Sequence, residues 1–314
     1  MIKIAINGMG RIGRSAFKIA SDKFDGQVEI VAVNDLVDNK TLANLIKHDS
    51  NYGIWEHEIE SDEKNIIIDG KRILSLSEKD PISLPWKELS VDVVLECTGV
   101  FTEVEKSKLD ITAGAKRVII SAPAKGEGVG TYLIGVNADK DTGEGRVINN
   151  ASCTTNCISP VVAVMQAKFG IAKAMMTTVH SYTQDQLLQD GPHKDLRRAR
   201  AAGINIVPTT TGAAIATTEA IPELKGLFDG ASIRVPTPVG SISDITFLLK
   251  RKTSVEEINN ALSEAANGNL KGILAVSNDP LVSTDIVGRT ESSIVDLPLT
   301  QVVDGDMVKV FAWY

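Results

Sequence analysis

The feature that most constrains the fold is a glycine-rich turn close to the amino terminus. Residues 2–6 form a short, largely β-branched run, which predicts a buried strand. The turn follows as Gly-Met-Gly-Arg-Ile-Gly at residues 8–13, and apolar residues then recur at helical spacing over residues 11–23. A second strand is predicted over residues 28–33. This order forms a βαβ unit, which builds a parallel sheet with right-handed crossovers.

The turn fits the spacing G-x-G-x-x-G of a dinucleotide-binding site. The pattern is weak alone, but here it follows a strand and opens a helix. Gly8 would permit the tight turn, Gly10 the close approach of a pyrophosphate, and Gly13 the packing of helix against strand. Asp35, at the end of the second strand, would bind the adenosine ribose and repel a 2′-phosphate, which favours NAD over NADP. The alternative is an ordinary turn with an incidental acid.

Length and composition set the class of protein. A chain of 314 residues suits two domains of roughly 150 residues each. A hydrophobic content of 43% with 23% charged residues is typical of a soluble globular protein. The net charge of −7 argues against nucleic acid as a primary partner. Three cysteines cannot form a disulfide framework, and neither a signal peptide nor a membrane-spanning apolar run is found, so we expect a cytoplasmic protein with no membrane partner.

The two halves of the chain have different patterns. Strands and helices alternate at first, which predicts an α/β fold with a Rossmann-type doubly wound parallel sheet over residues 1–151. Longer strands in series follow, which predict an α+β catalytic domain with a mixed or antiparallel sheet over residues 152–314. Residues 182–207 are polar and lack periodicity. Loops of that length usually carry function or an interface.

Cys153 stands where the second domain begins and where a helix is expected to start. A helix N-terminus stabilises a thiolate, and a protonated histidine nearby would add to this. His180, at the end of a predicted strand, is the candidate base. A reactive thiol beside a hydride carrier points to oxidation of an aldehyde through a thioester. Cys153 and Cys157 lack further ligands at metal spacing, so no metal site is expected, and Cys97 is interpreted as a small buried hydrophobe.

Five parts of the chain together resemble the phosphorylating glyceraldehyde-3-phosphate dehydrogenases, in their bacterial and plastid branch. They are the fingerprint with Asp35, Ser152 to Cys157, His180-Ser181-Tyr182-Thr183, Pro208 to Ala214, and Arg234-Val235-Pro236-Thr237-Pro238. The likeness runs from Met1 nearly to Tyr314 at family spacing. It implies conversion of D-glyceraldehyde 3-phosphate to 1,3-bisphosphoglycerate with NAD and inorganic phosphate, as in glycolysis and gluconeogenesis.

The resemblance also implies roles for individual residues. Cys153 would attack the aldehyde, His180 would take the hydroxyl proton of the thiohemiacetal, and phosphate would cleave the thioester. Thr183 and Arg234 would bind the phosphate of the substrate. The attacking phosphate would be bound by Ser152, Thr154, Thr211 and Gly212, and Arg198 would lie between the two sites. The cofactor-binding residues beside the glycines and Asp35 are Arg11, Ile12, Lys79, Thr98 and Ser121. The segment from Ser181 to Val207 resembles a loop that reaches a neighbouring subunit, which implies a homotetramer.

Some alternatives stay open at this stage. The sequence ends at Trp313-Tyr314, where family members continue with a turn that holds the nicotinamide and with a last helix. The alternative to an active dehydrogenase is therefore a relative that binds NAD weakly, or a non-catalytic dinucleotide-binding protein. An NADP-linked variant is opposed by Asp35 and Pro192, and an erythrose-4-phosphate variant by the intact run at residues 209–214. A cysteine protease would leave the fingerprint unexplained.

Overall fold

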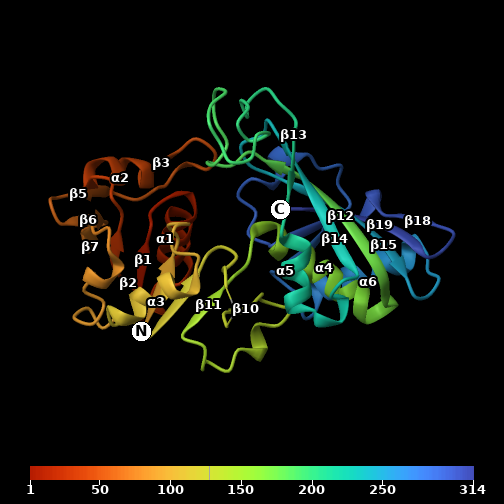
Figure 1. Cartoon of the computed structure of the whole chain (residues 1–314), viewed down its shortest axis with the longest axis horizontal. Coiled ribbons are helices and arrows are strands. Elements are labelled where there is room, and N and C mark those ends of the chain that lie inside the picture. The colour runs from red at the N-terminus through yellow and green to blue at the C-terminus, as the bar shows by residue number, and fades with distance from the viewer. Residues whose placement is uncertain (127) are drawn as a thin grey trace. The chain divides into compact units, whose positions relative to one another are not determined.

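The computed structural model describes residues 1–126 and 128–314 and shows two compact units (Figure 1). The first unit comprises residues 1–132 and 141–151. The second unit comprises residues 133–140 and 152–314. Each unit has its own sheet and is described separately below.

The first unit is built on a nine-stranded sheet in the order β10-β11-β9-β8-β1-β2-β7-β6-β5. The strands are β1 (Ile2–Asn7), β2 (Val28–Asn34), β5 (Ile59–Ser61), β6 (Asn65–Ile68), β7 (Lys71–Leu76), β8 (Val93–Glu96), β9 (Arg117–Ile120), β10 (Gly130–Thr131) and β11 (Val147–Asn149). All neighbours are parallel except the β5-β6-β7 meander, which is antiparallel. The predicted parallel sheet of Rossmann type is therefore confirmed.

Apolar side chains cover both faces of this sheet. Ile4 and Ile6 of β1 pack in one core cluster with Phe17, while the intervening Ala5 packs in a second cluster with Trp86. Alternate residues of a strand point to opposite faces, so both faces need a cover. The helices of the unit are α1 (Arg11–Lys23), α2 (Asn39–Lys47) and α3 (Val104–Thr112), with a one-turn helix η1 (Pro81–Ser83) and a small ribbon of β3 (His48–Asp49) and β4 (Gly53–Ile54).

Strand order places the candidate ligand edge. β1 lies between β2, which follows α1, and β8, which comes later in the chain. Connections leave β1 and return to opposite sides of it, which makes the carboxyl ends of β1 and β8 a topological switch point. Open α/β sheets bind ligands at such points.

The second unit is built on an eight-stranded sheet in the order β13-β14-β12-β15-β19-β17-β16, with β18 paired to β19. The strands are β12 (Ile171–Ser181), β13 (Val207–Thr210), β14 (Phe228–Val235), β15 (Ile242–Leu249), β16 (Leu274–Ser277), β17 (Ser293–Asp296), β18 (Gln301–Val303) and β19 (Met307–Trp313). β12 runs parallel to β14 and antiparallel to β15, so the sheet is mixed, as predicted. The helices are α4 (Cys153–Phe169), α5 (Ala213–Ala220) and α6 (Val255–Asn267), with short turns η2 (Ala138–Lys140), η3 (Pro222–Leu224), η4 (Ser283–Ile286) and η5 (Leu297–Leu299).

One part of the expected domain division differs from the structure. Residues 133–140 fall in the predicted first domain, yet they cluster with the second unit. A Cβ added at Gly135 would lie 2.8 Å from Leu270 Cδ2 and 2.9 Å from Ile273 Cδ1, so this stretch packs closely against the residues that follow α6. Nothing in the local sequence of residues 133–140 signals that distant contact. The loop predicted over residues 182–207 contains neither helix nor strand as far as residue 206, and Val207 is already the first residue of β13 (Figure 1).

Candidate active site

Cys153 is the first residue of α4. Ser152 precedes it in extended conformation and caps the helix, since its Oγ accepts a hydrogen bond from Thr155 N at 3.1 Å. Cys153 is exposed, whereas Cys157, one turn later, is fully buried. The helix therefore presents one thiol at its N-terminus and packs the other in the core. Among the described residues, no group of three His, Cys, Asp or Glu side chains could hold a metal ion.

His180 ends β12 and faces the Cys153 thiol, with Nε2 3.4 Å from Sγ. Its other ring nitrogen, Nδ1, lies 2.6 Å from the carbonyl oxygen of Ser181. Ser181 O can only accept, whereas Arg234 Nη1, which can only donate, lies 3.0 Å from the same nitrogen. The shorter contact, to Ser181 O, favours the tautomer with the proton on Nδ1. Nε2 then keeps its lone pair toward the thiol. This is the tautomer that a proton acceptor needs.

The charge state of this pair depends on burial and on the neighbouring Arg234. Burial lowers the pKa of His180 to about 4, and the positive charge of Arg234 acts in the same direction. Cys153 is exposed as a residue, yet the protein atoms around its sulfur desolvate the thiol and raise its pKa, while hydrogen bonds from Thr154 and the charge of Arg234 oppose this. At neutral pH the resting pair is thus a thiol donating to a neutral imidazole. The thiolate forms when His180 takes the proton.

Tyr314 supports both members of the pair, although no motif predicted a role for it. Its hydroxyl bonds to Thr154 Oγ1 at 2.7 Å, one residue after Cys153, and to Thr178 Oγ1 at 2.6 Å on β12. Its ring packs edge-on against His180, with centroids 5.8 Å apart. Burial raises the pKa of the tyrosine. A neutral phenol can donate one of these bonds and accept the other, which fixes the start of α4 against the end of β12.

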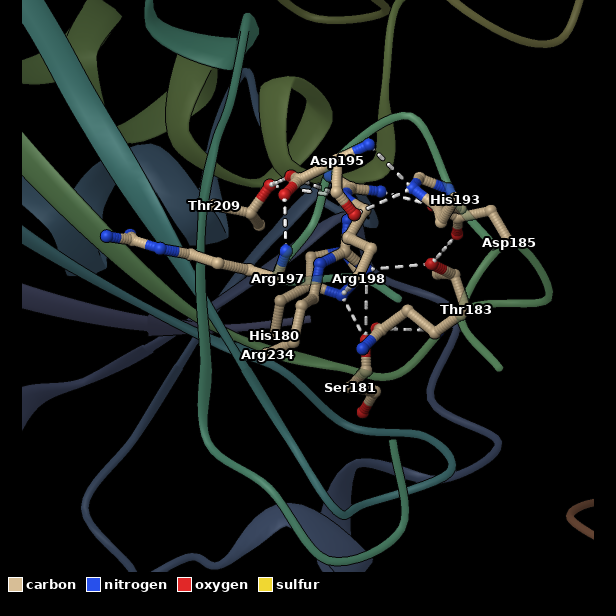
Figure 2. Close-up of polar contacts among 11 residues, drawn as sticks. His180, Ser181, Thr183, Asp185, His193, Asp195, Arg197, Arg198, Thr209 and Arg234 are labelled. Atoms are coloured by element: carbon tan, nitrogen blue, oxygen red, sulfur yellow. Dashed lines mark hydrogen bonds and ion pairs between the residues drawn. The ribbon is translucent and has the colours of Figure 1, made fainter. Parts of the chain in front are cut away.

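A cluster of cationic, hydroxyl and carboxylate side chains lies beside His180 (Figure 2). Arg234 is the register partner of His180 in the parallel β12–β14 pair, and its Nη1 donates to Ser181 O at 3.1 Å and to Thr183 Oγ1 at 3.0 Å. Arg234 Nε is buried and has no hydrogen-bond partner within residues 1–126 and 128–314. The structure therefore brings the predicted Thr183 and Arg234 together, and the guanidinium keeps hydrogen-bonding capacity that these contacts do not use.

Asp185 holds this cluster together and was missed by the sequence analysis. Thr183 Oγ1 donates to one of its carboxylate oxygens and Arg198 Nη1 to the other (Figure 2). Burial raises the pKa of Asp185, but the bonds from Thr183 and Arg198 outweigh it, so the pKa lies below its ordinary value. An internal carboxylate thus bridges two residues predicted to bind phosphate. An acid two residues after Thr183 was the available signal.

The residues predicted for the second phosphate are each engaged elsewhere in the second unit. Thr154 bonds to Tyr314, and Ser152 caps α4. Thr211 Oγ1 accepts from Ala213 N at 3.2 Å just before α5, whose N-cap is Gly212. Arg198 Nε donates to Thr209 Oγ1 at 3.1 Å and lies 3.6 Å from an Asp195 oxygen (Figure 2). Their joint role as a phosphate site stays a prediction.

A cavity of about 500 Å³ lies at the predicted edge of the first unit. It is lined by five residues predicted to bind the cofactor, namely Gly8, Gly10, Asp35, Lys79 and Thr98, and also by Asn7, Asn34, Leu36, Glu78, Cys97, Val100 and Phe101. The cavity therefore collects residues from the ends of three strands and from the glycine turn. Cys97 corrects one interpretation, because it is only partly buried and lines this cavity; burial raises the pKa of its thiol to about 11.

The three glycines of the turn differ in the structural reason for the missing side chain. Gly8 adopts φ +93°, and a Cβ there would lie 2.5 Å from Thr98 N. A Cβ at Gly13 would lie 1.9 Å from Gly8 O, so α1 packs directly on the turn. At Gly10 a Cβ would meet nothing within 4 Å. The space in front of the start of α1 is therefore open, which suits a pyrophosphate at a helix N-terminus.

The remaining predicted cofactor residues surround the same turn. Asp35 accepts from Met9 N at 2.7 Å and so braces the turn from the end of β2. Arg11 is paired with Asp49 and stacks over the ring of Tyr52, with Cζ 5.3 Å from the centroid. Ile12 is exposed in the first turn of α1, and Ser121 follows β9, where its N–H donates to Glu96 O at 3.0 Å. These three residues do not line the cavity.

Comparisons with known proteins cover the whole chain. The family model described as "Glyceraldehyde 3-phosphate dehydrogenase, NAD binding domain" matches residues 2–104, and "Glyceraldehyde 3-phosphate dehydrogenase, C-terminal domain" matches residues 152–314. A glyceraldehyde-3-phosphate dehydrogenase of Geobacillus stearothermophilus is 52% identical over 314 residues, which are 100% of this chain and 93% of the relative. The enzyme of that name from Thermotoga maritima is 53% identical over 100% of this chain and 94% of the relative. No helix within the described residues is long and apolar enough to cross a membrane.

Proposed function

This chain belongs to the glyceraldehyde-3-phosphate dehydrogenase family, and we propose that it oxidises D-glyceraldehyde 3-phosphate with NAD and inorganic phosphate to 1,3-bisphosphoglycerate. The single observation that carries the proposal is the pairing of Cys153 Sγ with His180 Nε2 at 3.4 Å at the start of a helix. Relatives named as dehydrogenases along the whole chain favour this activity over a non-catalytic relative.

The first chemical step follows from the resting hydrogen bond. His180 Nε2 takes the thiol proton, and Cys153 Sγ bonds to the aldehyde carbon to give a thiohemiacetal. The imidazole gives this proton to the former carbonyl oxygen, which becomes the hydroxyl of the thiohemiacetal. The neutral imidazole is then suited to remove the hydroxyl proton again as the hydride leaves. When bound, NAD supplies the acceptor for the hydride that leaves the thiohemiacetal carbon. A thioester on Cys153 remains, and inorganic phosphate attacks its carbonyl carbon and releases the thiol.

The substrate phosphate is assigned to Arg234, Thr183 and Arg198. Arg234 has a buried Nε without a partner among the described residues, and a guanidinium fork matches a phosphate oxygen pair. An incoming phosphate would displace the Asp185 carboxylate from Thr183 and Arg198, because the phosphate oxygens and the carboxylate oxygens compete for the same two donors. We assign the attacking phosphate to Ser152, Thr154, Thr211 and Gly212, as the family resemblance implies.

NAD is assigned to the cavity of the first unit. The open space before α1, the turn at Gly8 and the carboxylate of Asp35 fit a dinucleotide with an unmodified ribose. A 2′-phosphate would meet the Asp35 charge, so we propose NAD in preference to NADP. Lys79 also lines the cavity, where it would lie near the adenine.

A homotetramer is the assembly we propose. Support comes from the loop at residues 182–206, which exposes four aliphatic side chains, those of Leu188, Leu196, Ile204 and Ile206, by 71–87%. Apolar exposure of this kind on one segment is typical of a protein–protein contact. Sedimentation equilibrium of the purified chain checks the assembly, and a monomer at micromolar concentration would contradict it.

The direct test of the activity measures NADH formation with glyceraldehyde 3-phosphate, NAD and phosphate. Cys153→Ser is expected to lower kcat by about 10⁴-fold or more, because a hydroxyl is a far weaker nucleophile than a thiol at neutral pH. Cys157→Ser is the matched control. Its sulfur is buried 3.8 Å from Ser293 Oγ and away from the helix start, so activity should persist. Turnover in the Cys153 variant equal to that of the wild type would exclude the assigned nucleophile.

A further inference from the structure

Glu96 is a buried acid that the reaction scheme does not use. It ends β8, next to the cavity of the first unit, and only 1% of it is exposed. Its Oε1 accepts hydrogen bonds from both the N–H and the hydroxyl of Thr98. Its Oε2 accepts from Asn7 Nδ2 at 2.8 Å. Three donors thus converge on a group that, as a carboxylate, can only accept.

The bond to Asn7 begins a chain of oriented amides across the strand ends. Asn7 turns its amide nitrogen toward Glu96, so its Oδ1 faces β2 and accepts from Asn34 Nδ2 at 2.8 Å. Asn34 in turn accepts from Glu78 N at 2.8 Å and donates to Glu78 O at 2.9 Å. Each amide could flip in isolation, but an acceptor-only group at one end permits a single direction. Glu96 therefore orients Asn7 from one side, and the backbone N–H and C=O of Glu78 orient Asn34 from the other, so that both ends favour the same direction.

The residues of this hydrogen-bonded series also line the cavity. Asn7, Asn34, Glu78 and Thr98 all line it, while Glu96 lies behind them. Thr98 also packs closely on Gly8, because a Cβ added at Gly8 would lie only 2.5 Å from Thr98 N. A shift of Thr98 would thus move the glycine turn. We propose that Glu96 is a positioning residue for the dinucleotide, holding Asn7 and Thr98 in the places that shape its site.

The proposal rests on the assignment of NAD to this cavity. The surroundings of Glu96 include one further acid, Asp110 of α3, which is fully buried and accepts from Trp86 Nε1 at 2.7 Å. Burial raises the pKa of Glu96 to about 7, hydrogen bonds from Thr98 and Asn7 oppose this, and the charge of Asp110 adds to it. Asp110 is not part of the oriented chain. Asp110→Asn is therefore a matched control for the loss of a buried acid nearby.

The experiment compares NAD binding by calorimetry and the KM for NAD in E96Q and D110N. A glutamine has one acceptor oxygen, so its NH₂ must face either Asn7 Nδ2 or the donors of Thr98. E96Q is expected to raise the Kd and the KM for NAD by about tenfold, as for a lost hydrogen bond to a charged group. The KM for glyceraldehyde 3-phosphate and the alkylation rate of Cys153 without NAD should stay at wild-type values. D110N should bind NAD as the wild type does.

A donor–acceptor swap completes the test. In N7D/E96Q the glutamine NH₂ can donate to the new aspartate, whose other oxygen still accepts from Asn34, so part of the affinity lost in E96Q should return. NAD binding of E96Q equal to that of the wild type, or equally weakened in D110N, would overturn the proposal. If E96Q does not fold, N7D is compared with N7D/E96Q: recovery of binding supports the proposal and its absence refutes it. A wild-type protein that binds no NAD would instead refute the cofactor assignment.

Discussion

The helices that begin at the two candidate sites start in different ways. α4 begins after Ser152, whose hydroxyl accepts from Thr155 N at 3.1 Å and closes the helix end. α1 begins after Gly10, which provides no side-chain cap. The first amides of a helix lack partners within it, so those of α1 still call for an acceptor.

Conformation does not explain the glycine at position 10. Its φ of −68° and ψ of −162° belong to extended backbone that any residue adopts, and a Cβ there would meet nothing within 4 Å. What glycine contributes is space at a positive helix end. In this pair of helices, the capped start of α4 carries the Cys153 thiol, whereas the uncapped start of α1 leaves its amides open to an anion from outside.

The largest expected effect tests the α4 side of this comparison. His180→Asn removes the acceptor of the thiol proton, and kcat is expected to fall by about 10²–10⁴-fold. NAD affinity should not change, because the cavity lies in the other unit. Steady-state kinetics and calorimetry measure the two. A variant that loses NAD binding while keeping kcat would reverse the assignment of the two helix starts.

The pH profile sharpens the same prediction. His180 has a pKa of about 4, below the ordinary 6.5, so its imidazole is the neutral acceptor at any pH above that value and loses this role as pH falls through it. The acid limb of kcat/KM should therefore lie well below pH 6.5. His180→Asn should lack this limb. A limb near pH 6.5 in the wild type would contradict a buried, neutral His180.

A substitution at Gly10 tests the α1 side. Gly10→Asp supplies the missing cap, so the helix should gain a few tenths of a kcal/mol. The same carboxylate takes the place of a pyrophosphate oxygen, and the KM for NAD should rise about tenfold through its charge. Gly10→Asn is the control, with the same shape and no charge, and should raise the KM less. Thermal melting and initial rates give the two readouts. Unchanged NAD binding in Gly10→Asp would show that the open helix end is not used.

The smallest effect concerns the cap itself. Ser152→Ala removes the acceptor of Thr155 N, and the free energy of unfolding should fall by about 1 kcal/mol. Ser254 caps α6 in the same way, accepting from Glu257 N at 3.2 Å, so Ser254→Ala should be equally destabilised. Only Ser152→Ala should also raise the KM for inorganic phosphate. Equal phosphate kinetics in the two variants would mean that Ser152 is a cap and nothing more.

Much of the fold was predictable because its signals are local. The helix predicted over residues 11–23 is α1 with the same bounds, and the strand predicted over residues 28–33 is β2, which ends one residue later. Such elements depend on periodicity and on caps within a few residues. β17 (Ser293–Asp296) was not predicted, because four residues buried on both faces carry no alternation. The place of residues 133–140 was wrong for a similar reason, since it depends on packing against residues near Leu270.

The candidate site was likewise predictable only where its signals are local. Its residue types were identified from motifs, but Asp185 and Tyr314 were missed because their roles come from contacts that the motifs do not describe. The charge state of His180 was also beyond the motifs, because it depends on burial and on Arg234, which lower the pKa of the imidazole to about 4. Burial and neighbouring charge depend on the complete fold.

What the sequence by itself determined was the set of parts: a βαβ unit with an open glycine turn, a thiol at a helix start, and a histidine at a strand end. Each of these depends on interactions between residues a few positions apart. Only the tertiary structure decided how the parts meet. Sγ and Nε2 come together across 27 positions, Asn7 reaches Glu96 across 89, and Tyr314 reaches Thr154 across 160. These meetings depend on strand order and register, which arise from the packing of the whole sheet rather than from any local stretch.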